Sequence, residues 1–302
     1  MATTTRSTII AAYRPGLYKL WKADQKDHPT FYDKIFTVVK SSRAYEELAE
    51  IIGLGLAEVK PEAASSVYDT PAQGPVTRFV HIAYSKGYII TKEAIADNLY
   101  KEMSVKRIMA LNRSFRITKE IVSSNVLNRA FNGDFVGGDG QPLLSAAHPS
   151  SVGSYSNTLD VPADLSEASL ETMLTQMRRA TDARGLPMSI QSRALIVPPE
   201  LAFEAERILF SDGRAGTDLN DVNVIKRNSM FPGGIIINPY LVDPNAWFIK
   251  TDALDGLMMF QREPYTFTED NDFDTDNAKA KGYERYSVGW ANPRALYGSP
   301  GG

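Results

Sequence analysis

The strongest hydrophobic pattern in the chain is helical and lies between residues 97 and 132. Apolar residues recur there on one helix face, at Ile108, Leu111, Phe115, Val122 and Val126. Asp97 or Asn98 can cap the start, and Asn132 with Gly133 supplies an end. Because each helical residue adds about 1.5 Å, a single helix here would be roughly 50 Å long. Two shorter helices with a break near Asn112 are the alternative.

The first part of the chain, residues 1–55, is expected to form an arm followed by a short helix. FYDKIFTVVK has the composition of a strand, whereas SSRAYEELAEII begins with serines and places Tyr45, Leu48 and Ile52 on one helix face. Residues 56–92 contain two strand-like runs, LAEVKPEAASSVYD and VTRFVHIAYSKGYIIT, with a turn predicted at TPAQGP. An isolated two-stranded ribbon is marginal in water, so this hairpin needs a further surface, from its own chain or from a neighbour.

The rest of the chain mixes helices and strands. The glycine-rich loop GDFVGGDGQP precedes helices predicted in SLETMLTQMRRATDARG and ELAFEAERILFS. Strands are predicted in RALIVPP, GGIIINPYL and AWFIKTD, and the closing runs GLMMFQREPYTFTED and YERYSVGWANPRALYG are β-structure. Because helices and strands do not alternate with a regular βαβ period, the predicted fold class is α+β.

The composition narrows the class of protein. The chain has 302 residues, 43% of them hydrophobic, and a formal net charge of -3, so it can bury a sizeable core and lacks a global basic excess. The absence of cysteine excludes disulfides and thiolate sites and suits a reducing cytoplasm. No apolar run is long enough to span a membrane, and the first residues lack a secretory signal. We expect a soluble intracellular protein with no membrane partner.

The acidic segment TEDNDFDTDN at residues 268–277 invites comparison with a calcium loop. An EF-hand loop requires glycine at its sixth position and glutamate at its twelfth. A loop that starts at Asp270 has Thr275 and Lys281 at these positions, and the register that starts two residues later fails as well. An acidic turn is therefore predicted. The histidines lack the spacing of a zinc pair, and the glycine-rich segments lack the full nucleotide-binding patterns, so no metal site and no cofactor are expected.

One trio of residues has the side-chain types of a nucleophilic enzyme. Asp139, Ser145 and His148 lie together in GDGQPLLSAAHP. Their spacing matches no known nucleophile arrangement, and the G-x-S-x-G elbow is absent. We expect His148 to be structural and predict no catalytic residue, although a hydrolase remains the alternative from a different class.

Basic side chains are frequent along the predicted long helix. Lys106, Arg113 and Arg116 are the candidates for a face that contacts nucleic acid. Glu102 and Glu120 lie among them, so a solvated face of mixed charge is the default interpretation.

Seven segments, taken in order, resemble the major capsid proteins of tailed bacteriophages, which have the Hong Kong 97-type capsid fold. They are SSRAYEELAEIIGLG, AEVKPE, YSKGYIITKEAIADNLY, FNGDFVGGDGQPLLSAAHP, ATDARGLPMSIQSRALIVPPELAFEAERIL, NPYLVDPNAWFIKTD and EDNDFDTDNAKAKGYERYSVGWANPRALYG. Together they cover most of the chain. The resemblance implies a structural protein and no enzyme: a head subunit that assembles into an icosahedral shell around double-stranded DNA.

The resemblance also implies a role for each segment. Residues 1–55 would be the N-terminal arm with its short helix, and residues 56–92 the extended loop that reaches over an adjacent subunit. Residues 93–135 would carry the spine helix of the peripheral domain, residues 136–247 the axial domain, and residues 248–302 the strands that return to the peripheral domain. The expected inter-subunit contacts at the loop tip are Asp69, Thr70, Pro71, Gln73, Pro75 and Arg78.

The partners implied by the resemblance are many copies of the chain itself, in pentamers and hexamers. A separate scaffolding protein, a portal, a decoration protein and packaged double-stranded DNA on the inner face complete the set. The expected location is the virion capsid, assembled in the host cytoplasm. Lys60 and Lys86 lie in or beside the predicted hairpin, but nothing identifies a partner for a covalent cross-link, so none is predicted. The alternative within the same fold is an encapsulin-like nanocompartment shell.

Overall fold

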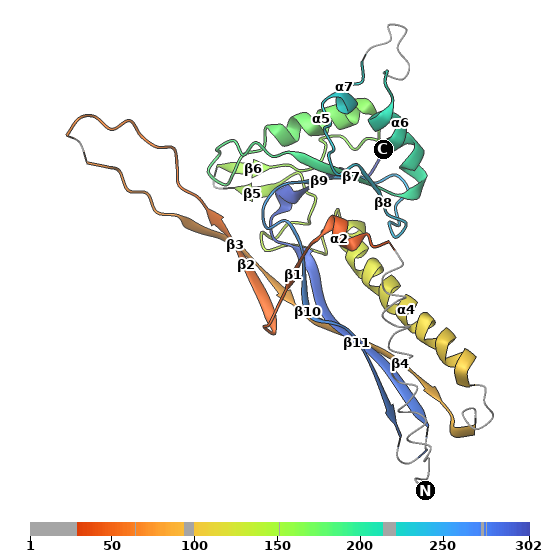
Figure 1. Cartoon of the computed structure of the whole chain (residues 1–302). Coiled ribbons are helices and arrows are strands. Elements are labelled where there is room, and N and C mark those ends of the chain that lie inside the picture. Colours follow the sequence, from red (N-terminus) through yellow and green to blue (C-terminus); the bar gives the residue numbers. More distant parts are fainter. Residues whose placement is uncertain are drawn as a thin grey trace.

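The computed structural model describes residues 29–63, 65–93, 100–150, 152–213, 222–272, 275 and 277–302. Within these residues the chain forms a globular lobe, an elongated lobe and a ribbon that projects from the junction between them (Figure 1). The predicted α+β class is confirmed. The expected arm before residue 29, and the helix caps expected at Asp97 or Asn98, lie outside the described residues.

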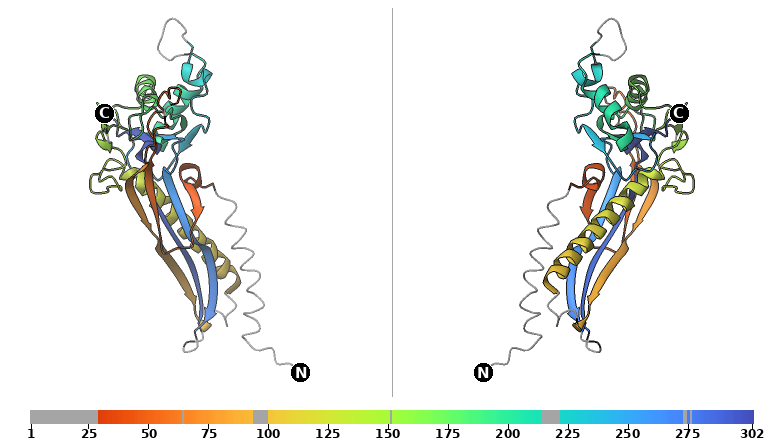
Figure 2. Two further views of the ribbon diagram at one scale, coloured as in Figure 1. Left: turned by 90° about the vertical axis from the view of Figure 1, so that its left-hand side faces the viewer. Right: turned by 90° about the vertical axis from the view of Figure 1, so that its right-hand side faces the viewer.

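The elongated lobe is a four-stranded sheet with one long helix along it. The strands follow the order β1 (Thr37–Lys40), β10 (Leu257–Asn271), β11 (Ala278–Trp290) and β4 (Ile82–Ile90). Strand β1 runs parallel to β10, and the other pairs are antiparallel. Helix α4 (Tyr100–Asn128) runs along this sheet in every view (Figures 1 and 2).

Helix α4 is a single element of 29 residues, so the break expected as an alternative near Asn112 is wrong. It ends at Asn128, a few residues before the predicted stop. Asn112 is buried and accepts a hydrogen bond from the Tyr265 hydroxyl at 3.0 Å. Beside it, the rings of Phe115 and Tyr265 pack with their centroids 4.5 Å apart. Gly282 makes room for them, because a Cβ there would lie 2.6 Å from both rings.

The globular lobe is built on a second four-stranded sheet. Its order is β12 (Leu296–Ser299), β9 (Trp247–Thr251), β7 (Ser192–Val197) and β8 (Ile235–Ile237), with β7 parallel to β8. The predicted strands RALIVPP, GGIIINPYL and AWFIKTD are therefore confirmed. The remaining elements of the lobe are α5 (Glu167–Arg178), α6 (Ala202–Phe210), α7 (Val224–Arg227), the 3₁₀ turns Pro199–Leu201 and Pro293–Ala295, and the hairpin β5 (His148–Ser150) and β6 (Gly153–Tyr155).

Both faces of this second sheet are buried, and β7 shows how its sequence achieves this. Leu195 and Val197 lie in the core cluster that contains the apolar faces of α5 and α6. Ala194 and Ile196 point to the opposite side, into a cluster shared with α4 and the elongated sheet. A continuous apolar run is what a strand buried on both faces requires, and this is why the segment was readable from the sequence.

The projecting ribbon, called the extended loop below, consists of β2 (Tyr45–Ile52), β3 (Ala72–Val80) and the connection between them. The short helix expected at SSRAYEELAEII is therefore wrong. Glu46, Leu48 and Glu50 alternate as the more buried side of β2, and the two carboxylates hydrogen-bond to Ser41 and Arg294. These partners, one of them far away in the sequence, outweigh the helical spacing of the apolar residues.

The expected hairpin also differs from the observed one. The turn predicted at TPAQGP (residues 70–75) is wrong, because β3 begins at Ala72 and contains the last four residues of this segment. The run VTRFVHIAYSKGYIIT forms two strands of different sheets: β3 pairs with β2, whereas β4 pairs with β11. His81 lies between them, buried, with hydrogen-bond contacts to Ser41 (2.9 Å) and Ser287 (3.0 Å).

The closing part of the chain contributes to both lobes. Strands β10 and β11 belong to the elongated sheet, but β9 and β12 belong to the globular sheet. The expected return segment 248–302 is therefore not confined to one sheet. Among the helices that the structure describes, none has the length and apolarity needed to cross a membrane.

A short helix, α2 (Tyr32–Ile35), precedes β1, so only the second half of FYDKIFTVVK forms the predicted strand. Glu120 of α4 accepts hydrogen bonds from the backbone N–H groups of Phe31 (2.9 Å) and Tyr32 (3.1 Å). Burial raises the pKa of Glu120, and these two hydrogen bonds oppose the rise. Glu120 is therefore a buried anchor for α2, and its expected place on a solvated face is wrong.

The adjacent lysine is buried as well. Lys119 Nζ lies 2.6 Å from Glu284 Oε2 of β11, and their side chains are 11% and 1% exposed. Burial raises the pKa of Glu284, and Lys119 lowers it. The ammonium group also lies over the rings of Tyr32 and Tyr286, at 5.6 and 5.2 Å from their centroids. This ion pair joins α4 to the centre of the elongated sheet.

We predict that Lys119→Met lowers the free energy of unfolding of the unassembled subunit by about 3–5 kcal/mol, because Glu284 loses its buried partner. Urea denaturation measures this change. The control Lys106→Met removes an exposed lysine from the same helix and should change stability by less than about 0.5 kcal/mol. The double variant Lys119→Met/Glu284→Leu should recover most of the loss, and equal losses in Lys119→Met and the control would contradict the role of the pair.

Candidate functional site

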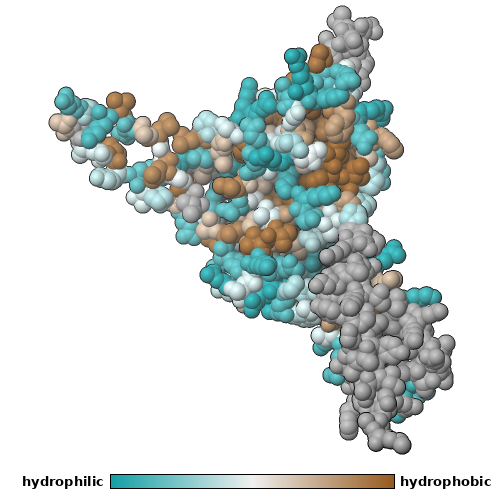
Figure 3. All heavy atoms as spheres, viewed as in Figure 1, coloured by the Kyte–Doolittle hydropathy of each residue, from teal (hydrophilic) through white to brown (hydrophobic). Residues whose placement is uncertain are grey.

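The outer part of the extended loop carries large apolar side chains that are exposed to solvent. Figure 1 shows it projecting away from both lobes, and Figure 3 shows apolar and polar residues side by side along its length. Val59 is 94% exposed, Tyr68 93% and Leu56 80%. Leu54 and Val67 are exposed as well. So many uncovered apolar side chains on one thin projection are typical of a surface that binds another protein.

Asp69 closes this outer part at its neck. Its carboxylate accepts hydrogen bonds from the backbone N–H of Gly55 (2.9 Å) and of Thr70 (2.8 Å). Arg184 of the globular lobe pairs with the same carboxylate at 2.5 Å and donates to the Thr70 carbonyl at 3.0 Å. The Gly55 amide, followed by Arg184, lowers the pKa of Asp69. The neck is thus held to the globular lobe of its own subunit.

The root of the loop is fixed by a second set of contacts. Arg294 Nη1 lies 3.1 Å from Glu50 Oε1 of β2, and Arg294 itself is 2% exposed. On the other strand, the ring of Phe79 meets Phe260 of β10 edge to face, with a centroid distance of 5.0 Å. Leu48 packs against the same small cluster. A charged contact and an apolar contact therefore hold β2 and β3 from opposite lobes.

The six residues predicted as inter-subunit contacts lie at the neck and in or just before β3, not at the far end of the loop. They are Asp69, Thr70, Pro71, Gln73, Pro75 and Arg78. Arg78 pairs with Glu47 across the β2–β3 ribbon at 2.6 Å and covers the Tyr45 ring at 4.6 Å. The sequence analysis missed the exposed apolar residues Leu56, Val59 and Tyr68. The available signal was that apolar residues in LAEVKPEAASSVYD follow neither a helical nor a strand period.

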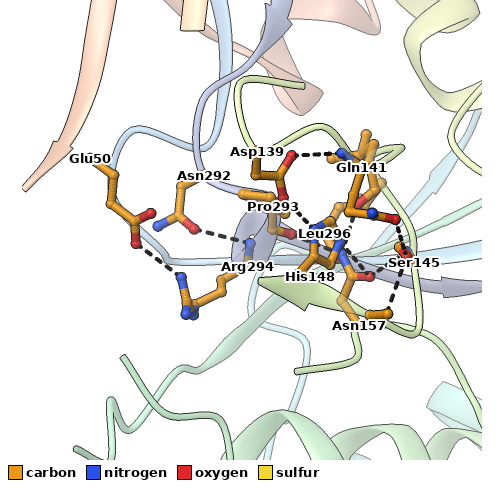
Figure 4. Close-up of polar contacts among 12 residues, drawn as sticks. Glu50, Asp139, Gln141, Ser145, His148, Asn157, Asn292, Pro293, Arg294 and Leu296 are labelled. Atoms are coloured by element: carbon orange, nitrogen blue, oxygen red, sulfur yellow. Dashed lines mark hydrogen bonds and ion pairs between the residues drawn. The ribbon is translucent and has the colours of Figure 1, made fainter. Parts of the chain in front are cut away.

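The trio considered for hydrolysis lies at the junction of the lobes (Figure 4). His148 is fully buried, its Nδ1 lies 2.6 Å from Asp139 Oδ2, and its ring stacks on Tyr155 at 5.0 Å. Its other nitrogen, Nε2, faces the side-chain oxygen of Asn157 at 3.2 Å. The Ser145 hydroxyl donates to Gln141 at 3.1 Å.

This geometry does not form a catalytic triad. A general base must present a nitrogen lone pair to the nucleophile, but Nε2 of His148 faces an amide oxygen instead. That oxygen is fixed, because the Asn157 amide nitrogen donates to three backbone carbonyls, those of Leu143, Pro293 and Leu296. The cluster links three stretches of chain, which fits the structural role predicted for His148.

The basic candidates of α4 lie on one stripe. Lys106 and Arg113 are exposed and Arg116 is half-buried. Arg113 and Arg116 border a hollow of about 650 Å³ that is also lined by Phe31 and Tyr240. The structure thus brings two of the three cations together at one concave surface, with Lys106 further along the same helix face.

The comparisons with known proteins agree with this architecture. A sequence model described as phage capsid protein matches residues 76–299. The chain belongs to this family. The match begins within β3 and covers most of both lobes of the capsid subunit, including the Asp139, His148 and Asn157 cluster. No curated protein matches the sequence.

Solved structures share the fold of the capsid subunit at low sequence identity. The virus-like particle from Pyrococcus furiosus is 12% identical, with a TM-score of 0.56 over 95% of this chain and 99% of the other. The capsid of cyanophage P-SCSP1u is 12% identical, with a TM-score of 0.54 over 89% and 87%. The procapsid of bacteriophage JBD30 is 15% identical, with a TM-score of 0.51 over 98% and 75%. The expected Hong Kong 97-type fold is confirmed, and the chain is a subunit of a phage capsid.

We predict that Arg184→Ala accelerates amide hydrogen exchange in residues 53–71, because the neck loses its contact with the globular lobe. Global stability should change little, since the pair is exposed to solvent. Hydrogen exchange of the unassembled subunit, read by mass spectrometry, measures the effect. Arg193→Ala is the matched control, because it removes a surface pair with Asp252 that lies away from the loop. Unchanged exchange in Arg184→Ala would show that the neck is held by other contacts.

We also predict different roles for Ser145 and His148 in stability. Ser145→Ala should cost roughly 1 kcal/mol, the net contribution of one hydrogen bond. His148→Ala should cost roughly 3 kcal/mol or more, because it empties a buried site and leaves Asp139 with the Gln141 N–H but without the imidazole. Urea denaturation of the unassembled subunit separates the two. An ester-hydrolysing activity of the purified protein that both substitutions abolish would overturn the structural assignment.

Proposed function

We propose that the chain is the major subunit of an icosahedral head that encloses double-stranded DNA, and that it acts by assembly rather than by catalysis. The observation that carries the proposal is the extended loop, whose apolar side chains are nearly fully exposed at Leu56, Val59 and Tyr68. Burying such side chains on another subunit gains about 25 cal/mol per Å² of apolar surface. The subunit would then work by binding other subunits in a fixed geometry and would catalyse no reaction.

The partners and the place of assembly follow from this proposal. Copies of the chain would gather as pentamers and hexamers, with the globular lobe as the axial domain and α4 as the spine of the peripheral domain. A separate scaffolding protein, a portal and a decoration protein would complete a head assembled in the host cytoplasm. Lys106, Arg113 and Arg116 would contact DNA phosphates on the inner face. The inter-subunit role of Asp69, Thr70, Pro71, Gln73, Pro75 and Arg78 stays a prediction.

A nanocompartment shell on the same fold is the alternative, although the family match favours the phage capsid. The nucleic-acid content of purified particles separates the two functions. Particles filled with double-stranded DNA support the head, and empty or protein-filled particles from phage-producing cells support the compartment.

We predict that the full chain forms closed particles in negative-stain images, and that replacing residues 56–67 with a short Gly-Ser turn abolishes them. The cut can be closed without strain at the neck, because Asp69 already binds the Gly55 N–H at 2.9 Å. The shortened subunit should keep its circular dichroism spectrum, because the removed residues lie outside β2 and β3.

The matched comparison uses point substitutions. Leu56→Ser with Val59→Ser should reduce particle yield, whereas Val242→Ser with Leu254→Ser should not, although all four side chains are at least 80% exposed. Normal yield from the shortened chain would refute the role of the loop. A wild-type chain that stays a compact monomer under all assembly conditions would refute the function.

A further inference from the structure

The only asparagine of the chain that is followed by glycine lies just beyond the end of α4. Asn132 and Gly133 are both exposed, in the turn that leads from α4 into the globular lobe. A backbone amide nitrogen can attack the side-chain carbonyl of the asparagine before it, and a Cβ on the attacking residue hinders this approach. Glycine has no Cβ and the largest backbone freedom, so this pair is the one most open to the reaction.

The turn holds the Asn132 side chain close to the bond that would react. Its Oδ1 accepts a hydrogen bond from the Asp134 N–H at 2.9 Å, and its backbone carbonyl accepts one from the Phe135 N–H at 3.1 Å. A side-chain oxygen bound to the N–H two residues further on closes a small ring of the turn type. The Gly133 nitrogen is a member of that ring, as is the side-chain carbonyl carbon of Asn132.

The nitrogen of Gly133 is also accessible. Within the described residues, the Gly133 N–H donates to no acceptor, and an added Cβ at this position would meet nothing within 4 Å. Water can therefore reach the N–H, and the peptide can turn toward the side chain without displacing a neighbour. Asn157 is the opposite case, because it is buried and its amide nitrogen donates to three backbone carbonyls.

We propose that Asn132 deamidates spontaneously through a cyclic imide with Gly133, which makes position 132 a site of slow, one-way covalent change. Hydroxide removes the Gly133 N–H proton, and the nitrogen attacks Cγ of Asn132. The Asp134 N–H stabilises the negative charge that develops on Oδ1. The bond from Cγ to the amide nitrogen then breaks, and ammonia leaves with a proton from water, which regenerates hydroxide. A water molecule opens the imide at either carbonyl, and the products are aspartate and isoaspartate.

The products change the junction between α4 and the globular lobe. Both place a new carboxylate beside Asp134, and isoaspartate also adds one carbon to the main chain. On one side of position 132, the ring of Phe131 stacks on Phe248 with a centroid distance of 6.0 Å. On the other side, Val136 forms a β-bridge with Pro142. Because the altered residue lies between two fixed contacts, a longer main chain strains the turn that joins them.

Ageing of the purified full-length subunit tests the proposal. The protein is kept at mildly alkaline pH, and peptide mapping by mass spectrometry follows position 132 over time. Aspartate and isoaspartate should both appear, at a rate that rises with hydroxide concentration, because the Gly133 nitrogen must lose its proton. Asn228 and Asn245 are internal controls: both are exposed but are followed by serine and alanine, so they should convert much more slowly.

Two variants isolate the chemistry and its effect. Gly133→Ala adds a Cβ that meets no other atom, so the circular dichroism spectrum should stay unchanged while conversion of Asn132 slows several-fold. Asn132→Asp supplies the new charge at an unchanged main-chain length. Faster hydrogen exchange of residues 129–144 in the aged wild-type chain than in this variant would show the effect of the extra carbon.

Three results would overturn the inference. The first is a folded subunit that keeps the amide of Asn132 while a free peptide of residues 128–137 loses it, because the fold then protects the site. The second is equal conversion in Gly133→Ala and the wild type, which excludes the cyclic imide. The third is equal conversion at Asn228 or Asn245, because position 132 is then not distinguished. None of these results bears on the proposed function in assembly.

Discussion

Arg294 is almost completely buried, and a buried guanidinium group is costly unless acceptors surround it. Here it lies 3.1 Å from the Glu50 carboxylate, donates to the Thr181 carbonyl at 3.0 Å, and stacks over the Tyr155 ring at 4.0 Å. These partners come from the extended loop and from two parts of the globular lobe. Because the buried guanidinium group must keep these partners, the direction in which the extended loop leaves the two lobes is fixed. Figure 4 shows its contact with Glu50.

The polar cluster next to Arg294 explains why an enzyme-like trio occurs in a structural protein. Asn157 and His148 are fully buried and hydrogen-bonded, and the Asn157 side chain connects the chain near Leu143 with the chain near Leu296. Hydrogen bonds are directional, whereas apolar packing is not, so such a cluster specifies one arrangement of segments. The cluster therefore gives every copy of the subunit the same internal arrangement of these segments.

Much of the fold was readable from the sequence because local pattern and final burial agree. The α4 stripe at Ile108, Leu111 and Phe115 is buried, and the apolar run of β7 is buried on both faces. The prediction failed at residues 45–52, because the inward positions of β2 include Glu46 and Glu50. These two glutamates can face inward because they hydrogen-bond to Ser41 and Arg294. Arg294 lies far from β2 in the sequence, so the residues around β2 give no sign of this contact.

The site was less predictable than the fold for a related reason. A sequence pattern reveals residues that are buried within the chain, but no pattern around Val59 and Tyr68 sets these two exposed residues apart from other surface residues. The neck contact at Asp69 and the root contact at Glu50 have a further consequence for binding. A loop already held in one direction loses less conformational freedom when it docks, so more of its apolar burial appears as affinity. In the proposed shell, each contact can then remain modest, since the strengths of many repeated contacts add.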